Sequence, residues 1–128
     1  MKAVRFHEHG GIEELRCEEV ADPVAGPGEM VVLVRACAIN YLDLRERAGL
    51  PAVRIPLPHI PGSDVSGIVE SVRPGVGPRH ELFQVLQLVQ TGYLRPVVSA
   101  VLPLEEAGRG QQMIENREHF GKVVLAVP

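Results

Sequence analysis

The sequence predicts a mainly β domain with flanking helices, of the α+β class, and three observations support this fold. Short runs rich in β-branched residues recur between turn signals, and three segments show helical spacing or the residues typical of helix ends. No apolar run reaches the ~20 residues of a membrane span. The chain has 128 residues, of which 45% are hydrophobic and 23% charged. We therefore expect one soluble domain with one core.

The N-terminal third is expected to consist of strands. Runs at 2–6 and 15–20 are separated by the turn signal His9-Gly10-Gly11, which predicts a hairpin. The longest β-type run extends from residue 29 to 38. Within it, Val31 to Val34 is apolar without alternation, which is typical of a strand buried on both faces.

A short helix is expected over residues 42–48. Asn40 precedes it as an N-cap and Gly49 follows it as a stop. Each proline fixes its own φ and restricts its predecessor, so the next segment should be extended and irregular. Four prolines hold this segment: Pro51, Pro56, Pro58 and Pro61. A strand at 65–72 and a turn at 73–78 follow.

The C-terminal half alternates helix and strand signals. Apolar residues recur at helical spacing from Leu82 to Val89, which predicts a helix. A second helix is expected to start at Pro103 and to run through Ile114, although Gly108 and Gly110 each weaken it by about 1 kcal/mol relative to Ala. The remaining strands are expected at 97–102 and 122–127.

Charge and composition exclude several partners. The net charge is −3, with 13 basic residues interspersed among 16 acidic ones, so there is no basic stripe for nucleic acid. The chain begins with charged residues where a signal peptide needs an apolar run, so we expect a cytoplasmic protein that does not bind a membrane. Cys17 and Cys37 are expected to be reduced and packed as small hydrophobes, with a disulfide as the alternative.

Nucleotide and nucleophile motifs are missing from the sequence. Gly108-Arg109-Gly110 lacks the third glycine of the dinucleotide fingerprint, because residue 113 is Met. The phosphate-binding loop, the nucleophile elbow and the H-E-x-x-H motif are also absent. Ser63 follows Gly62 with no histidine close in sequence, so Ser63 is interpreted as a turn residue.

Several segments together resemble the medium-chain dehydrogenase/reductase superfamily, in its zinc-type alcohol dehydrogenase-like and quinone oxidoreductase branch. They are Lys2-Ala3-Val4, Pro27-Gly28-Glu29, the run from Ala36 to Asp43, the run from Pro61 to Val69, Leu94 to Val98, Leu102 to Ala107, and the run from His119 to Leu125. The resemblance implies a GroES-like catalytic domain, a partly open β-barrel. It also implies NADPH-dependent reduction of quinones, carbonyls or activated double bonds.

Members of this superfamily are more than twice as long, and a complete cofactor domain separates the two parts that match this chain. Here the sequence runs directly from Val76 to His80. We expect one GroES-like domain, built from 1–77 and 79–128 and joined near Pro78 by a natural or engineered deletion. Such a chain would not bind NADPH tightly and would be inactive alone. The alternative is a non-enzymatic β-barrel module that self-associates as a homodimer through newly exposed surface.

The resemblance also suggests that catalytic zinc is absent. In zinc-dependent relatives, Cys stands at the position of Asn40, His at that of Ser63, and usually Glu at that of Asp64. An amide and a hydroxyl are poor zinc ligands beside thiolate and imidazole. A substrate carbonyl would then be polarised by hydrogen bonds.

By resemblance, the catalytic residues are Asn40, Tyr41 and Asp43, with Ser63 and Asp64 lining the substrate cleft and Lys122 meeting the cofactor. Each also has an ordinary structural explanation. Asn40 can serve as a helix cap and Tyr41 as a packing aromatic. Asp43 is favoured in a first helical turn by the helix dipole, and Lys122 is interpreted as a solvated strand lysine.

Overall fold

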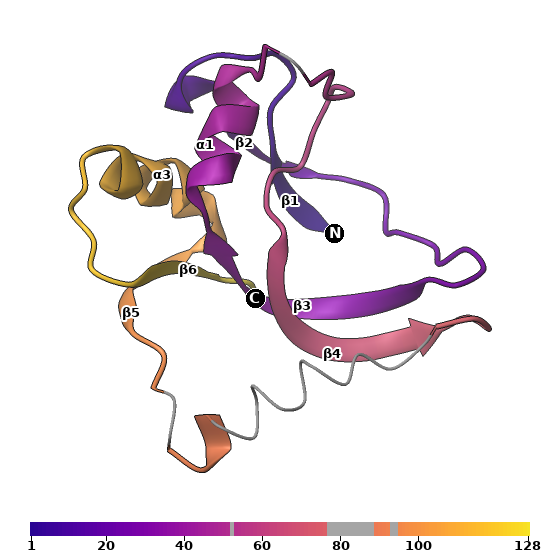
Figure 1. Cartoon of the computed structure of the whole chain (residues 1–128). Helices are drawn as coiled ribbons and strands as arrows, with labels where there is room; N and C mark the ends of the chain where they lie inside the picture. The colour runs from indigo at the N-terminus through magenta and orange to yellow at the C-terminus, as the bar shows by residue number, and fades with distance from the viewer. Residues whose placement is uncertain (52, 77–88, 93–94) are drawn as a thin grey trace.

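A computed structural model describes residues 1–51, 53–76, 89–92 and 95–128. The described residues form an α+β fold dominated by strands, as predicted (Figure 1). A hairpin of β1 (Lys2–Arg5) and β2 (Arg16–Glu19) accompanies a mixed four-stranded sheet. The order of that sheet is β4 (Asp64–Val72), β3 (Met30–Ile39), β6 (Lys122–Ala126) and β5 (Val98–Pro103). Over these residues the strands do not close into a barrel.

Strand β3 holds the sheet together. It pairs antiparallel with β4 along its length, and only its last four residues, Ala36 to Ile39, also pair with β6. Strand β5 adds to the far side of β6 in parallel orientation. The sheet is therefore widest at the C-terminal end of β3, where the helices also lie (Figure 1).

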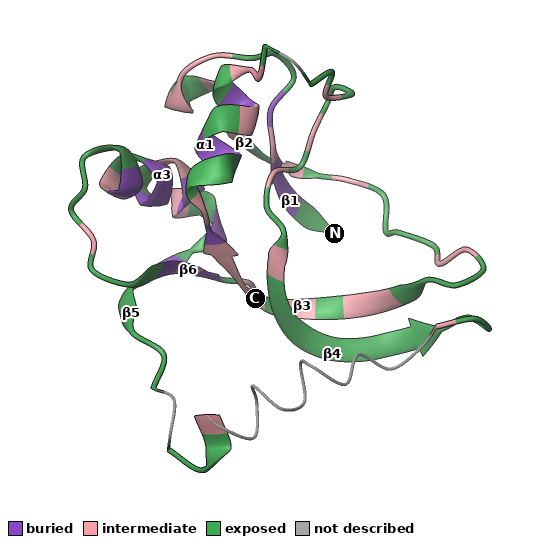
Figure 2. Cartoon of the chain, in the orientation of Figure 1, coloured by how far each residue is buried: buried purple, intermediate pink, exposed green. Residues whose placement is uncertain are grey.

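The prediction that Val31 to Val34 is buried on both faces is wrong. Leu33 is 42% exposed and Val31 is only half-buried. This half of β3 pairs with β4 alone, and nearly all of β4 is exposed (Figure 2). The helices at Tyr41–Ala48 and Ala107–Glu115 lie at the other end of the sheet, so among the described residues no second layer covers this half of β3. Periodicity reports which residues are apolar but not whether a layer is present to cover them.

Helix α1 (Tyr41–Ala48) begins and ends where its caps predict. The Asp43 carboxylate accepts a hydrogen bond of 2.9 Å from the backbone N–H of Asn40, the capping residue. Gly49 adopts φ +98°, which a glycine tolerates without strain, and its N–H donates to the Arg45 carbonyl. Between β1 and β2 lies a short 3-10 helix, η1 (Ile12–Glu14).

Helix α3 (Ala107–Glu115) follows β5 through the 3-10 turn η2 (Leu104–Glu106), which confirms the helix predicted from Pro103 to Ile114. Gly110 is buried, and a Cβ at this position would overlap Cδ1 of Ile39. The glycine that weakens the helix is therefore what allows it to approach the sheet closely. The helix predicted at Leu82–Val89, apart from Val89, and the join near Pro78 lie outside the described residues.

The core lies between the two helices and the β3–β6–β5 end of the sheet. Val123 is fully buried and Ile39 and Leu125 nearly so. Around them packs a cluster of buried apolar residues: Val4, Leu44, Leu102, Leu104, Ala107 and Ile114. Burial of such side chains contributes ~25 cal/mol per Å² of apolar area, so among the described residues this end of the sheet supplies most of the hydrophobic stabilisation.

Both cysteines are free thiols, as expected. Cys37 is half-buried against the core, whereas Cys17 is exposed, so the prediction that both pack as small hydrophobes holds only for Cys37. Cys17 lies on β2, which pairs only with β1 in a two-stranded sheet. None of the helices described is long and apolar enough to cross a membrane.

Candidate functional site

Three strand ends meet at one place and bring distant residues together. Asn40 follows the last residue of β3, Asp64 begins β4 and Lys122 begins β6. In the sheet, Ile39 lies opposite Val123 and Ala38 opposite Asp64. The strand register therefore places Asn40 beside both Asp64 and Lys122.

The three side chains form a closed triangle of polar contacts. The Asn40 amide donates from Nδ2 to Oδ2 of Asp64 over 3.0 Å. The Lys122 ammonium donates to Oδ1 of Asn40 over 2.5 Å and to Oδ2 of Asp64 over 3.1 Å. The hydrogen bond from Asn40, followed by that from Lys122, holds the pKa of the Asp64 carboxyl below its ordinary value.

Asp43 lies behind this triangle and has a different environment. Its side chain is buried, and burial raises the pKa of its carboxyl. The nearby charges of Glu46 and Asp64 raise this pKa further, while the Asn40 N–H opposes them. Asp43 and Asp64 both line a second cavity of about 550 Å³ beside the β1–β2 hairpin. Asp43 is thus a buried residue that holds the backbone of Asn40 through a hydrogen bond.

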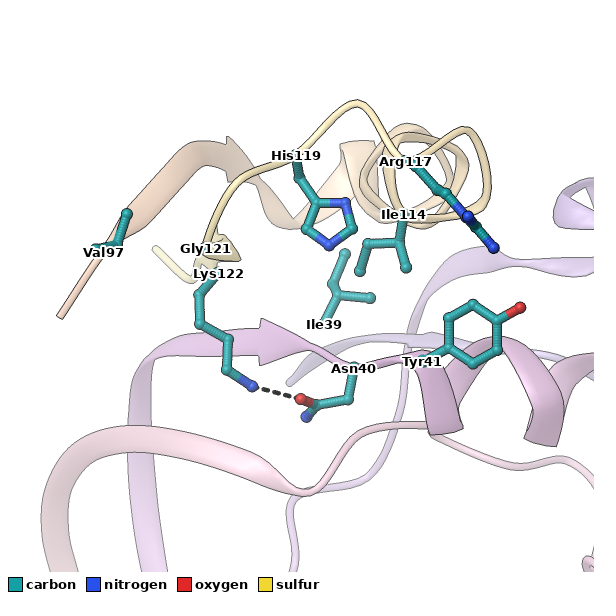
Figure 3. A pocket seen from close by; sticks show the side chains of 9 residues that line it. All are labelled: Ile39, Asn40, Tyr41, Val97, Ile114, Arg117, His119, Gly121 and Lys122. Carbon is teal, nitrogen blue, oxygen red and sulfur yellow. Dashed lines mark hydrogen bonds between the residues drawn. The ribbon is translucent and has the colours of Figure 1, made fainter.

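A pocket of about 590 Å³ opens beside the triangle (Figure 3). It contains three of the predicted site residues, Asn40, Tyr41 and Lys122. The Asn40–Lys122 contact forms one edge in the view of Figure 3. The other lining residues are Ile39, Val97, Ile114, Arg117, His119 and Gly121. The volume is within the range of small-molecule sites.

Three predicted site residues, Asp43, Asp64 and Ser63, do not line this pocket. The side chain of Asp64 is 45% exposed and reaches the site through Asn40 and Lys122. Ser63 is exposed on the loop before β4 and lines neither of the two cavities. The structure therefore brings Asn40, Tyr41, Asp43, Asp64 and Lys122 together and leaves Ser63 at the margin.

Arg117 and His119 are pocket residues that the sequence reasoning did not single out. Arg117 follows α3 with φ +56°, and its N–H donates to the Ile114 carbonyl while that of Glu118 donates to Met113. This is the Schellman arrangement, in which glycine is usual at the left-handed position. For His119 a signal was available in the sequence, because it begins the segment His119 to Leu125 already noted for its resemblance. Arg117 precedes that segment and had no such signal.

These donors do not fit a catalytic zinc ion. The three positions compared above with zinc ligands hold the Asn40 amide, the Ser63 hydroxyl and the Asp64 carboxylate. Only the carboxylate is a good zinc ligand. The Lys122 ammonium already occupies the space between Asn40 and Asp64. In the described ranges, no cluster of three His, Cys, Asp or Glu side chains has an arrangement that could hold a metal ion.

The pocket fits a small molecule better than a whole dinucleotide. The sequence has no glycine-rich fingerprint to receive a pyrophosphate. The predicted cofactor contact, Lys122, already shares its charge with Asp64. A nicotinamide or substrate ring is of the size that this pocket accepts, and Tyr41 and Lys122 are the residues that would contact it.

Comparisons with known proteins identify the family of the chain. A family model described as zinc-binding dehydrogenase matches residues 19–125. The quinone oxidoreductase of Rattus norvegicus is 39% identical over 77 residues, which are 59% of this chain and 23% of that protein. A mycobacterial protein solved in complex with NADPH is 36% identical over 60% of this chain and 23% of its own, with a TM-score of 0.54. The crystal structure of an NAD-dependent alcohol dehydrogenase matches the fold over all of both chains with a TM-score of 0.91, at 17% identity.

Proposed function

Because the chain belongs to the medium-chain dehydrogenase/reductase superfamily, through its zinc-binding dehydrogenase family, we propose that it is the catalytic, substrate-binding domain of an NADPH-dependent oxidoreductase. The substrate class is quinones, carbonyls or activated double bonds. The observation that carries this proposal is the pocket beside the Asn40–Lys122–Asp64 triangle. The chain spans about a quarter of the length of the curated relatives it matches.

The triangle supplies a hydrogen-bond donor to the pocket. A protonated lysine has three N–H donors, and Lys122 uses two of them on Asn40 and Asp64. Within the described part of the chain no acceptor takes the third, which can donate to a substrate oxygen in the pocket that Lys122 lines. Because Asn40 and Asp64 hold the ammonium in place, its charge is preorganised to polarise that oxygen.

Hydrogen bonding takes the place of a metal in this proposal. The Asn40 amide and the Ser63 hydroxyl are poor zinc ligands. Lys122 and Asn40 therefore orient and polarise the substrate without a Lewis acid. NADPH, when bound, supplies the hydride. Tyr41 and Ile39 form the wall against which a flat substrate ring lies.

We further propose that the chain is a single GroES-like domain built from 1–77 and 79–128, without the cofactor domain that its relatives carry. A chain that cannot position NADPH loses the proximity contribution to rate, which is worth many orders of magnitude. The expected result is no NADPH oxidation by the purified chain with duroquinone, a quinone that does not add thiols. Turnover at ordinary enzyme rates would contradict the proposal that the chain has no cofactor domain.

The substrate pocket is tested separately by binding. Duroquinone added to the ¹⁵N-labelled chain should shift the backbone amides of Asn40, Tyr41 and Lys122. Lys122→Met should weaken this binding, whereas Lys2→Met should not, because Lys2 pairs with Glu105 on the surface. Unchanged amide signals at the pocket would contradict the proposed substrate site.

A second candidate function, a self-associating module, is favoured by the surface of β4. This strand lies at the edge of the sheet, and four of its valine and isoleucine side chains are more than half exposed. They are Val65, Ile68, Val69 and Val72. Apolar residues on an edge strand promote association between copies. Analytical ultracentrifugation across a range of concentrations should detect a homodimer, and only monomer at every concentration would contradict this function.

A further inference from the structure

We propose that the pocket binds a small carboxylate with an apolar body, and that Arg117 recognises the carboxylate group. The inference rests on the proposed function, because it names the chemical class of substrate for the same pocket. It goes beyond that function, since a quinone or simple carbonyl carries no anionic group.

The charges around the pocket support an anion. Among the residues that the structure describes, the lining includes the cations Arg117 and Lys122 and the imidazole of His119, and it includes no carboxylate. The charge of Lys122 is shared with Asp64, 3.1 Å away. Arg117 forms neither an ion pair nor a side-chain hydrogen bond with any residue that the structure describes. Its guanidinium is the unshared positive charge of the site, and its planar fork matches a carboxylate in two parallel hydrogen bonds.

The backbone at Arg117 gives an independent reason to consider this residue. Its φ of +56° lies in the left-handed region, where a side chain other than glycine is strained. A helix end of this type would be more stable with glycine. Strain held at a pocket residue is typical of functional positions.

The remaining walls suit an apolar body. Ile39, Ile114 and Val97 line the pocket together with the ring of Tyr41. Figure 3 shows the His119 ring among Ile39, Ile114 and Lys122, with Arg117 and Tyr41 on one side of the view and Lys122 on the other. The buried Nδ1 of His119 has no hydrogen-bond partner among the described residues.

The test is an NMR titration of the ¹⁵N-labelled chain with sodium benzoate, and it needs no cofactor. Benzamide provides a neutral molecule of the same shape, and inorganic phosphate an anion without an apolar body. Benzoate should shift the amides of Asn40, Tyr41 and residues 117–122, and should bind about tenfold more tightly than benzamide. Added salt should weaken the binding of benzoate but not that of benzamide.

Variants of Arg117 test whether its guanidinium recognises the carboxylate of benzoate. Arg117→Gln should weaken benzoate binding about tenfold, and Arg117→Lys, which keeps the charge but loses the fork, should weaken it less. Arg54→Gln is the matched control, because Arg54 is an exposed loop residue that lines neither cavity. Equal affinity of Arg117→Gln and Arg54→Gln, or of benzamide and benzoate, would overturn the proposal.

Three further outcomes are decisive. Phosphate binding as tightly as benzoate would overturn the apolar-body part, since the pocket would then select charge alone. If duroquinone shifts the pocket amides and benzoate does not, the anion proposal fails while the proposed function stands. If benzoate binds through Arg117 and duroquinone does not bind, the anion site stands and the quinone assignment fails.

Discussion

The Lys122 ammonium lies 2.5 Å from Oδ1 of Asn40, although 82 residues separate them in the chain. This contact joins the first residue of β6 to the capping residue of α1. Both residues also hydrogen-bond to Asp64, so the three elements that meet here share one charged group. The contact therefore couples the position of α1 to the charge state of Asp64.

Asn40→Ala should raise the pKa of Asp64 toward the ordinary aspartate value. The hydrogen bond from Asn40 is the largest cause of the lowered pKa, so this variant should have a greater effect than Lys122→Met. The measurement is an NMR pH titration of the Asp64 carboxyl carbon. Lys2→Met serves as a control that should leave the pKa of Asp64 unchanged. Equal titration curves for Asn40→Ala and the unmodified chain would contradict the hydrogen bond from Asn40 to Asp64.

The direction of this shift also fixes how stability depends on pH. A carboxyl whose pKa is lower in the folded chain stabilises the fold above its unfolded value of about 3.9, and this contribution is lost as the pH falls through the folded value. Asp43 has a raised pKa and acts in the opposite sense: its contribution weakens as the pH rises from the unfolded value through the folded one. Urea unfolding of Asp64→Asn should therefore show a smaller loss of stability between pH 5 and 3 than the unmodified chain.

Arg47 is the buried charge that ties α1 to α3. Its guanidinium donates to Gln111 Oε1, Glu115 Oε1 and the Gly10 carbonyl, each over 2.7 Å, while only 3% of the residue is exposed. Arg47→Met should lower the free energy of unfolding by about 3 kcal/mol, because the buried Gln111 Oε1 and two partly exposed acceptors lose their partner. Urea denaturation measures this loss.

Arg109→Met provides the comparison for Arg47→Met. Arg109 lies on α3, and its guanidinium forms an exposed ion pair with Glu106 one turn away. Exposed pairs of this kind contribute about 0.5 kcal/mol or less. A loss at Arg47 no larger than that at Arg109 would show that the buried network does not hold the helices together.

Local sequence signals were sufficient to predict most elements of the fold. Asn40 and Gly49 delimit α1 through their own capping chemistry, and the β-branched run after Gly121 becomes β6. The exposure of Leu33 was not predictable from the run that contains it, because burial depends on whether another layer covers the strand. A pattern within one strand carries no information about that layer.

The candidate site was only partly predictable for a similar reason. Asn40, Tyr41 and Lys122 were identified by resemblance, but the contact between Asn40 and Lys122 follows from the register of β3 against β6. Arg117 and His119 carry no motif. They reach the pocket because α3 ends in a left-handed turn, which depends on a backbone conformation that arginine seldom adopts.

Two glycines of the same helix should respond in opposite ways to alanine. At Gly110 the new Cβ would overlap Ile39 Cδ1 and would lie 3.4 Å from Val123, so Gly110→Ala should destabilise the chain by about 1–3 kcal/mol despite its better helix propensity. At Gly108 the nearest atom is the Ile12 carbonyl oxygen at 3.9 Å, so Gly108→Ala should stabilise by up to about 1 kcal/mol. Stabilisation by both variants in urea denaturation would contradict the close packing of α3 on the sheet.

Arg117→Gly should separate stability from recognition. Glycine adopts the left-handed conformation without strain, so the variant should raise the free energy of unfolding by about 1 kcal/mol. Arg117→Ala is the matched control, since alanine keeps the backbone strain, and it should not stabilise the chain. Both variants lack the guanidinium and should lose benzoate binding to the same degree. Equal stability of the two variants in urea would contradict a left-handed conformation at residue 117, because the relief of strain by glycine should exceed its larger unfolded-state entropy.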